Sequence, residues 1–142
     1  MFSRRQSVIV IGASHLMNFY LVANVIRARR KYGVKYPALY ADASNCKDAK
    51  ERDAFNSVQR AHQNTLENWA SIQILILVNS LVFPRASATL GAVWVLGRVI
   101  YGYGYASGGP EGRKAGGIIS HLGDIPLILM SFYSGASLAG LV

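Results

Sequence analysis

Cysteine is almost absent from this sequence, which contains only Cys46. A single cysteine excludes an intramolecular disulfide. The three histidines, His15, His62 and His121, lie far apart in different segments, so no metal site is expected. Cys46 stands in a polar stretch, where we expect an ordinary loop thiol, with lipidation as the alternative.

Charge is also scarce, and negative charge is the scarcest. Charged residues make up 15% of the 142-residue chain, against about 25% in an average soluble domain. Seven acidic residues stand against 15 Lys and Arg, for a formal net charge of +8. The positive residues flank apolar runs and do not alternate with aromatic residues. This pattern argues against nucleic-acid binding. With 51% hydrophobic residues gathered in runs, the composition predicts a single-domain, all-α integral membrane protein.

Four segments have the length and composition of transmembrane helices, at about residues 8–30, 55–83, 86–106 and 116–141. The first follows Arg4 and Arg5, as in a signal peptide, but it ends in a stop-transfer cluster of basic residues and is expected to remain as a helix. Pro84 leaves so short a connection that the second and third helices must be antiparallel neighbours. Residues 107–117 are rich in glycine and predict a loop.

The loops that follow the first and third helices carry most of the Lys and Arg, so we expect both loops in the cytosol and both termini on the other side. This topology brings polar residues from distant segments to one membrane depth: Arg29, Arg30, Arg60, Asn64, Glu67, Arg98, Tyr101, Tyr105 and Arg113. Such a set suits a small zwitterion with more than one carboxylate and one amine. A further arginine could hold a thiolate, because a nearby cation lowers the pKa of a thiol.

Structural roles for the same residues are the alternative. Arg60 and Glu67 could simply pair within the bundle, and Arg98 could extend to lipid phosphates. Tyr101, Tyr103 and Tyr105 could belong to an aromatic belt at the membrane surface, and Tyr103, which points away from the other two, fits that role best.

The fourth segment adds two features outside this set. Asp124 lies in its first half, and we expect it to make an interhelical hydrogen bond. Ser131, Gly135 and Ala139 form a stripe of small residues at four-residue spacing, which favours close helix packing.

Two motifs resemble the MAPEG family, the membrane-associated proteins of eicosanoid and glutathione metabolism. They are QRAHQNTLE at residues 59–67 and RVIYGYGY at residues 98–105, followed by Arg113. The segment ARRKY at residues 28–32 makes the pattern most similar to the type 3 microsomal glutathione S-transferases. The resemblance extends from Val8 to about residue 134.

This resemblance implies a homotrimer of four-helix subunits in the endoplasmic reticulum membrane, with a site between subunits that faces the cytosol. Glutathione would be the co-substrate, and a lipophilic electrophile or lipid hydroperoxide would arrive from the membrane lipid. The activity implied is that of a glutathione S-transferase, with glutathione peroxidase or leukotriene C4 synthase-like activity as further options. The residues implied for glutathione binding are Arg29, Arg60, Asn64, Glu67, Asn68, Tyr101 and Tyr105. Arg113 would stabilise the thiolate, and Arg30 would assist the second substrate.

The sequence departs from the family pattern after Glu67. Many members have a tyrosine and then a proline that bends the second helix, whereas this chain has Asn68, Trp69 and Ala70. We therefore expect a straighter helix and a different pocket for the electrophile. Two other functions stay open: a non-catalytic, lipid-binding member that presents fatty acid to a partner enzyme, and a small membrane scaffold or channel subunit.

Overall fold

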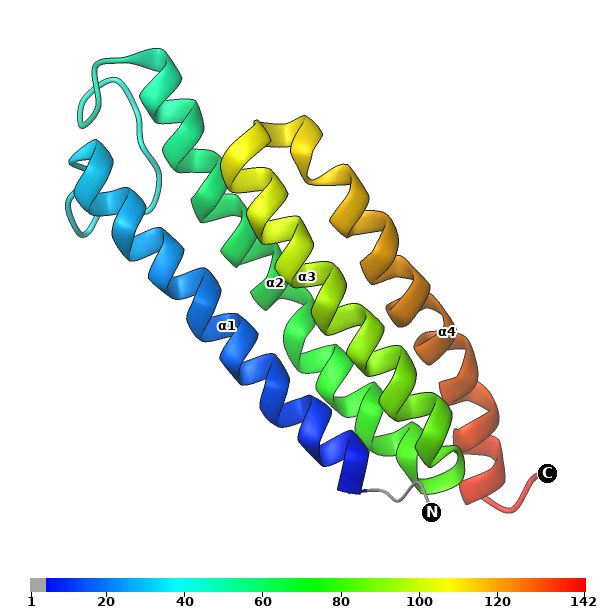
Figure 1. The fold of residues 1–142 in the computed structure, drawn as a ribbon. Helices are drawn as coiled ribbons and strands as arrows, with labels where there is room; N and C mark the ends of the chain where they lie inside the picture. The colour runs from blue at the N-terminus through cyan, green and yellow to red at the C-terminus, as the bar shows by residue number, and fades with distance from the viewer. Residues whose placement is uncertain (1–4) are drawn as a thin grey trace.

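A computed structural model describes residues 5–142 and shows an up-and-down bundle of four long helices (Figure 1). The helices are α1 (Arg5–Tyr32), α2 (Ala49–Val82), α3 (Pro84–Gly112) and α4 (Lys114–Leu138). The start of α1 and the end of α4 lie beside the α2–α3 turn, at what we call the terminal end (Figure 1). The α1–α2 loop and the α3–α4 junction lie at the opposite, loop end. No strand occurs among residues 5–142, so the predicted all-α, four-helix fold is confirmed; Arg4 lies outside the described residues.

Three of the four described helices, α1, α2 and α4, are long and apolar enough to cross a membrane. Helix α3 falls below that hydropathy, although it runs antiparallel beside helices of similar length. Helix α3 packs against the other three helices. Its buried glycines and tyrosines and Arg98 therefore contact protein and are shielded from lipid. The polar groups of α3 that are buried, such as Arg98 and Tyr101, face the neighbouring helices, while Leu96 and Tyr103 remain exposed on its outer face.

Helix α2 begins at Ala49, six residues before the predicted start at Phe55. The side chain of Asp48 accepts hydrogen bonds from the backbone N–H groups of Lys50 (2.7 Å) and Glu51 (3.0 Å). This N-cap satisfies donors that the first helical turn leaves without partners. The charged stretch before Phe55 is thus the first turn and a half of the helix.

The glycine-rich segment is also helical, in contrast to the predicted loop over residues 107–117. Helix α3 continues to Gly112 with a break at Gly109, where φ is 62° and ψ is −152°. Only glycine adopts this backbone conformation without strain, and Pro110 follows it with a fixed φ that suits a new helical turn. Arg113 alone then separates α3 from α4.

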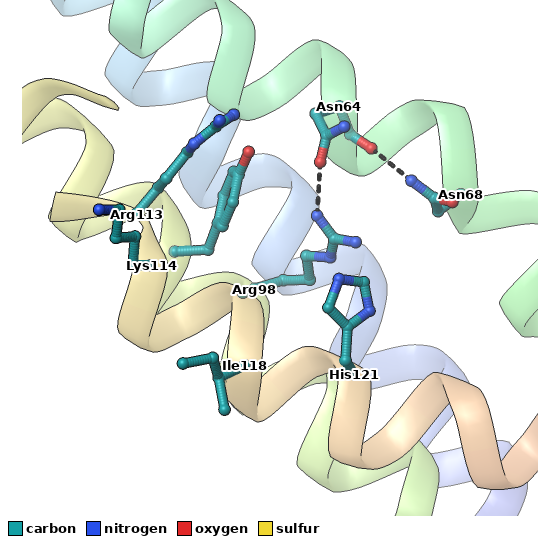
Figure 2. A pocket seen from close by; sticks show the side chains of 9 residues that line it. Asn64, Asn68, Arg98, Arg113, Lys114, Ile118 and His121 are labelled. Carbon is teal, nitrogen blue, oxygen red and sulfur yellow. Dashed lines mark hydrogen bonds between the residues drawn. The ribbon is translucent and has the colours of Figure 1, made fainter. Parts of the chain in front are cut away.

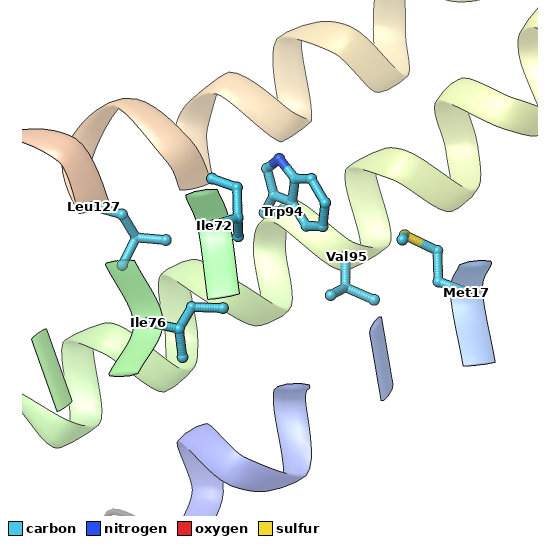
Figure 3. Close-up of a cluster of buried hydrophobic side chains, with 6 residues drawn as sticks. All are labelled: Met17, Ile72, Ile76, Trp94, Val95 and Leu127. Atoms are coloured by element: carbon cyan, nitrogen blue, oxygen red, sulfur yellow. The ribbon is translucent and has the colours of Figure 1, made fainter. Parts of the chain in front are cut away.

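The main apolar core lies in the middle of the bundle and draws on all four helices (Figure 3). Its buried members are Met17, Ile72, Ile76, Trp94, Val95 and Leu127. A second, smaller core packs the α1–α2 loop against α2, around fully buried Phe55. Cys46 belongs to this second core and is only 6% exposed, so it is a packed residue and lipidation is disfavoured.

Helices α3 and α4 approach closely through glycine. A Cβ atom at Gly116 would lie 2.1 Å from the backbone nitrogen of Tyr101, and one at Gly123 would lie 2.6 Å from the carbonyl oxygen of Leu90. The predicted stripe that includes Gly135 does not make this contact, because a Cβ there would have no neighbour within 4 Å. Close packing therefore involves the first half of α4, where it aligns the helix against the polar part of α3.

Candidate functional site: a cationic cavity at the loop end

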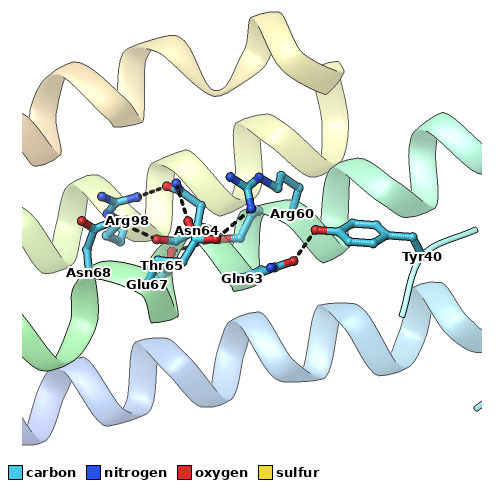
Figure 4. Close-up of polar contacts among 9 residues, drawn as sticks. Tyr40, Arg60, Gln63, Asn64, Thr65, Glu67, Asn68 and Arg98 are labelled. Atoms are coloured by element: carbon cyan, nitrogen blue, oxygen red, sulfur yellow. Dashed lines mark hydrogen bonds and ion pairs between the residues drawn. The ribbon is translucent and has the colours of Figure 1, made fainter. Parts of the chain in front are cut away.

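The polar face of α2 forms one continuous network (Figure 4). An Arg60 Nη atom lies 2.9 Å from Oε1 of Glu67, and the amide of Asn64 donates to Oε2 of Glu67 at 3.3 Å. These residues are spaced at i, i+4 and i+7, which places them on one side of an α-helix. The Arg60–Glu67 pair is about 40% exposed on each side chain. Such an exposed pair contributes little to stability, because water screens it.

Helix α3 adds a buried cation to this network. Arg98 is only 3% exposed and donates from Nη1 to Oδ1 of Asn64 at 2.8 Å. Its guanidinium also lies 5.4 Å from the Trp94 ring and 5.2 Å from the Tyr101 ring. The Nε–H of Arg98 is buried without a hydrogen-bond partner. Because a buried unpaired donor is costly, this nitrogen is available to an added acceptor.

A cavity of about 480 Å³ opens beside this network, between α2, α3 and α4 (Figure 2). Its lining residues are Asn64, Asn68, Arg98, Tyr101, Arg113, Lys114, Gly117, Ile118 and His121. Three of them are permanent or near-permanent cations and none is acidic. The cavity is therefore suited to a small molecule with negative charge.

Arg113 occupies the junction between α3 and α4 at the rim of this cavity. Its guanidinium lies 5.3 Å from the Tyr105 ring, which in turn stacks on Tyr101 with ring centroids 5.6 Å apart. Hydrogen bonding to the Tyr101 side chain raises the pKa of Arg113. The guanidinium therefore stays cationic at every physiological pH.

A second cavity, of about 500 Å³, lies on the outer side of the network. Arg60 and Tyr105 line it, together with Tyr40 and Asp53. Tyr40 comes from the α1–α2 loop and hydrogen-bonds to the side chain of Gln63 (Figure 4). The two cavities flank the same row of polar residues, so an elongated ligand could contact both.

Seven of the nine predicted site residues fall into three groups at the cavities or their network. Asn64, Asn68, Tyr101 and Arg113 line the first cavity. Arg60 and Tyr105 line the second. Glu67 lines neither cavity and joins the network through its carboxylate.

Arg29 and Arg30, at the end of α1, are not brought to either cavity within this chain. Arg29 is buried and donates to the carbonyl oxygens of Ala38 (2.8 Å) and Val34 (3.4 Å). Its guanidinium lies 4.2 Å from the Tyr36 ring, so it holds the α1–α2 loop in place. Arg30 is exposed at the surface of the bundle.

Helix α4 contributes cavity residues that the sequence did not indicate, above all His121. Its Nδ1 atom lies 3.1 Å from the carboxylate of Asp124, one turn further along α4. The expected interhelical hydrogen bond of Asp124 is therefore replaced by one within its own helix. The signal for this pair was the i, i+3 spacing of a histidine and an aspartate in an otherwise apolar helix.

An antiparallel helical bundle with three apolar spans and a cationic cavity defines a multi-pass membrane protein. The chain belongs to the MAPEG family, whose family model matches residues 7–133. It is also similar to a protein of Synechocystis sp. described as "Uncharacterized protein sll1147", with 33% identity over 127 residues. That match covers 89% of this chain and 85% of the relative. MAPEG is a family of membrane proteins that includes glutathione transferases.

Proposed function

We propose that the protein is a membrane-bound glutathione transferase and peroxidase of the type 3 microsomal kind. The observation that carries this proposal is the unbroken row of Arg60, Glu67, Asn64 and Arg98 beside a cavity that also contains Arg113. Glutathione has two carboxylates, one ammonium group and one thiol. The row supplies cations for the carboxylates and a carboxylate for the ammonium group.

The roles of these residues follow from their positions. Arg60 and Arg98 would bind the glutathione carboxylates, and the unpaired Nε–H of Arg98 offers one of the donors. Glu67 and Asn64 would bind the ammonium end, while Asn68, Tyr101 and Tyr105 would shape the cavity wall. Arg113 would stabilise the thiolate, because a fixed cation favours the ionised form of a thiol.

The reaction needs no covalent intermediate with the protein. Holding glutathione beside a lipophilic electrophile supplies proximity, and Arg113 supplies electrostatic stabilisation of the sulfur. The electrophile would enter from the bilayer, since Ile118 lines the cavity and the neighbouring surface of α4 is apolar. Lipid hydroperoxides and lipophilic electrophiles are the substrate classes that fit this route.

We further propose a homotrimer in the endoplasmic reticulum membrane with the loop end in the cytosol. The exposed apolar side chains of α1, such as Leu16 and Phe19 at 71% each, leave a surface for lipid or for another copy. Arg30 lines no cavity of its own chain. In a trimer, Arg30 of one copy would reach the cavity of a neighbouring copy. Native mass spectrometry of the detergent-solubilised protein tests this assembly: a trimer supports it, and a monomer contradicts it.

Turnover of chlorodinitrobenzene and cumene hydroperoxide with glutathione tests the proposed activity. We expect Arg113→Ala to lower turnover by about 10²–10³-fold, as removal of a transition-state donor does elsewhere. Glutathione affinity should change by only a few-fold, because other residues bind the carboxylates. The matched control is Lys47→Ala, which removes an exposed loop cation away from both cavities.

The outcomes separate this proposal from its rivals. Unchanged turnover in Arg113→Ala would contradict the role of that residue. Binding of fatty acid without binding of glutathione would favour a non-catalytic, lipid-presenting member. A protein that binds neither glutathione nor fatty acid would favour the role of a membrane scaffold.

A further inference from the structure

His121 and Asp124 form a pair that the binding of glutathione does not require. His121 lines the cavity from α4, opposite the α2 residues that would bind glutathione (Figure 2). Its Nδ1 atom lies 3.1 and 3.2 Å from the two carboxylate oxygens of Asp124. The histidine side chain is 61% exposed, whereas that of Asp124 is 11% exposed. One ring nitrogen is therefore held by a buried carboxylate while the other stays accessible.

This arrangement is the one that orients a histidine for proton transfer. A carboxylate that accepts from Nδ1 sets the ring orientation and leaves Nε2 as the reactive nitrogen. Asp124 does not itself line the cavity, and its buried carboxylate contacts the cavity histidine that it orients.

The position of His121 along α4 separates it from the thiolate site. His121 lies eight positions after Arg113, which corresponds to about 12 Å along a helix. Arg113 lies at the loop end, where a thiolate would be held, and His121 lies deeper, beside the apolar surface of α4. A molecule between them would present one reacting atom to the sulfur and another to the histidine.

We propose that His121, oriented by Asp124, donates a proton to the departing oxygen of a lipid hydroperoxide in this cavity. This inference rests on the proposed function. It adds a catalytic residue, His121, and a positioning residue, Asp124, and it makes oxygen-leaving substrates the preferred class. A departing alkoxide is strongly basic, so its protonation accounts for a large share of the rate.

The reaction balances with glutathione as the only reductant. The glutathione thiolate attacks the terminal oxygen of the hydroperoxide, the O–O bond breaks, and its electron pair leaves on the inner oxygen. That oxygen takes the Nε2 proton of the protonated His121 ring, which becomes neutral and keeps its Nδ1–H toward Asp124; the oxygen departs as the alcohol, while the glutathione becomes a sulfenic acid. A second glutathione converts the sulfenic acid to the disulfide and water, and His121 regains a proton from solvent.

Two substrates with different leaving groups test the proposal. Cumene hydroperoxide needs a proton at its leaving oxygen, whereas chlorodinitrobenzene releases chloride, which needs none. We expect His121→Gln to lower kcat/KM for the hydroperoxide by about 100-fold and for the chloroarene by less than about 3-fold. Asp124→Asn should lower kcat/KM for the hydroperoxide by about 10-fold. The His121 ring remains in this variant, but the carboxylate that orients it is lost.

Matched controls distinguish a chemical role from a structural one. His15→Gln changes a histidine that contacts the Trp69 ring (4.7 Å) and does not line the cavity, so both activities should stay unchanged. Should His121→Gln fail to fold, His121→Asn makes the same test with a smaller amide. Glutathione affinity, measured in parallel, should be the same in the wild type and the variants.

Each other result is decisive. Equal loss of both activities in His121→Gln, or loss of neither, would overturn the proton-transfer role and leave the transferase proposal intact. A wild-type protein active only on the chloroarene would do the same. A wild type inactive on both substrates would overturn the proposed function and this inference together.

Discussion

Asn79 and Asn64 lie on the same helix and both link α2 to a neighbour, but their networks end differently. Asn79, at the terminal end, is fully buried; its amide donates to the carbonyl oxygen of Leu127 (2.9 Å) and accepts from the Ser134 hydroxyl (2.8 Å). Asn64, at the loop end, accepts from Arg98 and donates to Glu67. The first network ends at backbone and hydroxyl groups, and the second continues through charges to a cavity.

The comparison distinguishes two kinds of polar group. Some form hydrogen bonds that hold helices together, and others keep a donor that is free to bind a ligand. Asn79 has partners for both ends of its amide, as expected of a polar group that links helices in a membrane protein. Arg98 keeps an unpaired Nε–H in a buried position beside a cavity of about 480 Å³. Buried charge in a membrane protein is retained mainly for function, so the loop end is where a ligand is expected.

Gly116→Ala should have the largest effect on stability. Its new methyl group would lie 2.1 Å from the Tyr101 backbone nitrogen, and neither backbone can yield without separating α3 from α4. We expect a loss of about 3 kcal/mol, measured by thermal unfolding in detergent, with glutathione binding lost as the cavity wall moves. Gly135→Ala on the same helix has no neighbour within 4 Å and should be neutral. Equal effects at both positions would contradict the close α3–α4 contact.

Asn79→Ala should damage the terminal end alone. The change leaves the Leu127 carbonyl oxygen and the Ser134 hydroxyl without their partner in a buried site. We expect a loss of about 2 kcal/mol in unfolding free energy, with glutathione affinity per folded molecule unchanged. If Asn79→Ala had the unfolding free energy of the wild type but a weaker affinity for glutathione, Asn79 would act in ligand binding. That result would contradict the separate roles of the two ends.

Glu67→Gln should damage the loop end alone. The amide keeps the size of the side chain but loses the charge that would attract the ammonium group of glutathione. We expect affinity to fall by about 10-fold, or 1.4 kcal/mol, in calorimetric titrations. The unfolding temperature should change little, because the Arg60–Glu67 pair is exposed. A large drop in unfolding temperature would assign this pair a structural role.

Arg30→Ala should have the smallest effect on glutathione binding. Arg30 is exposed and lines neither cavity of its own chain. We expect glutathione affinity within about 2-fold of the wild type, and any kinetic change confined to the KM of the electrophile. A strong loss of glutathione affinity would mean that Arg30 of another copy contacts glutathione directly.

The sequence predicted the helices and most of the polar row because both depend on spacing. Residues 60, 64 and 67 share a helix face in any α-helix, and a tight turn at Pro84 makes α2 and α3 neighbours. Those two facts bring Arg98 and Asn64 to a similar depth, and the hydrogen bond between them is known only from the structure. The close α3–α4 contact required knowing which glycines face a neighbour, and the small-residue stripe indicated the wrong half of α4.

Three other features of the structure could not be predicted from the sequence. They depend on the paths of long side chains or on helix signals within a charged stretch. Asp48 and Glu51 form an N-terminal helix signal within a stretch that its mixed charges made resemble a loop. Arg29 turns to the carbonyl oxygen of Ala38 because the α1–α2 loop folds back over α1, a path that residue spacing does not encode. The wide spacing of the three histidines argues only against a metal site, and the pairing of His121 with Asp124 indicates a function only because His121 lines the cavity.

The most direct test of the central claim is ultraviolet difference absorbance of glutathione bound to the detergent-purified protein near neutral pH. We predict a thiolate signal in the wild type that disappears in Arg113→Ala while calorimetry still detects binding. A thiolate signal of equal size in Arg113→Ala, or no binding of glutathione to the wild type, would contradict the assignment of this cavity.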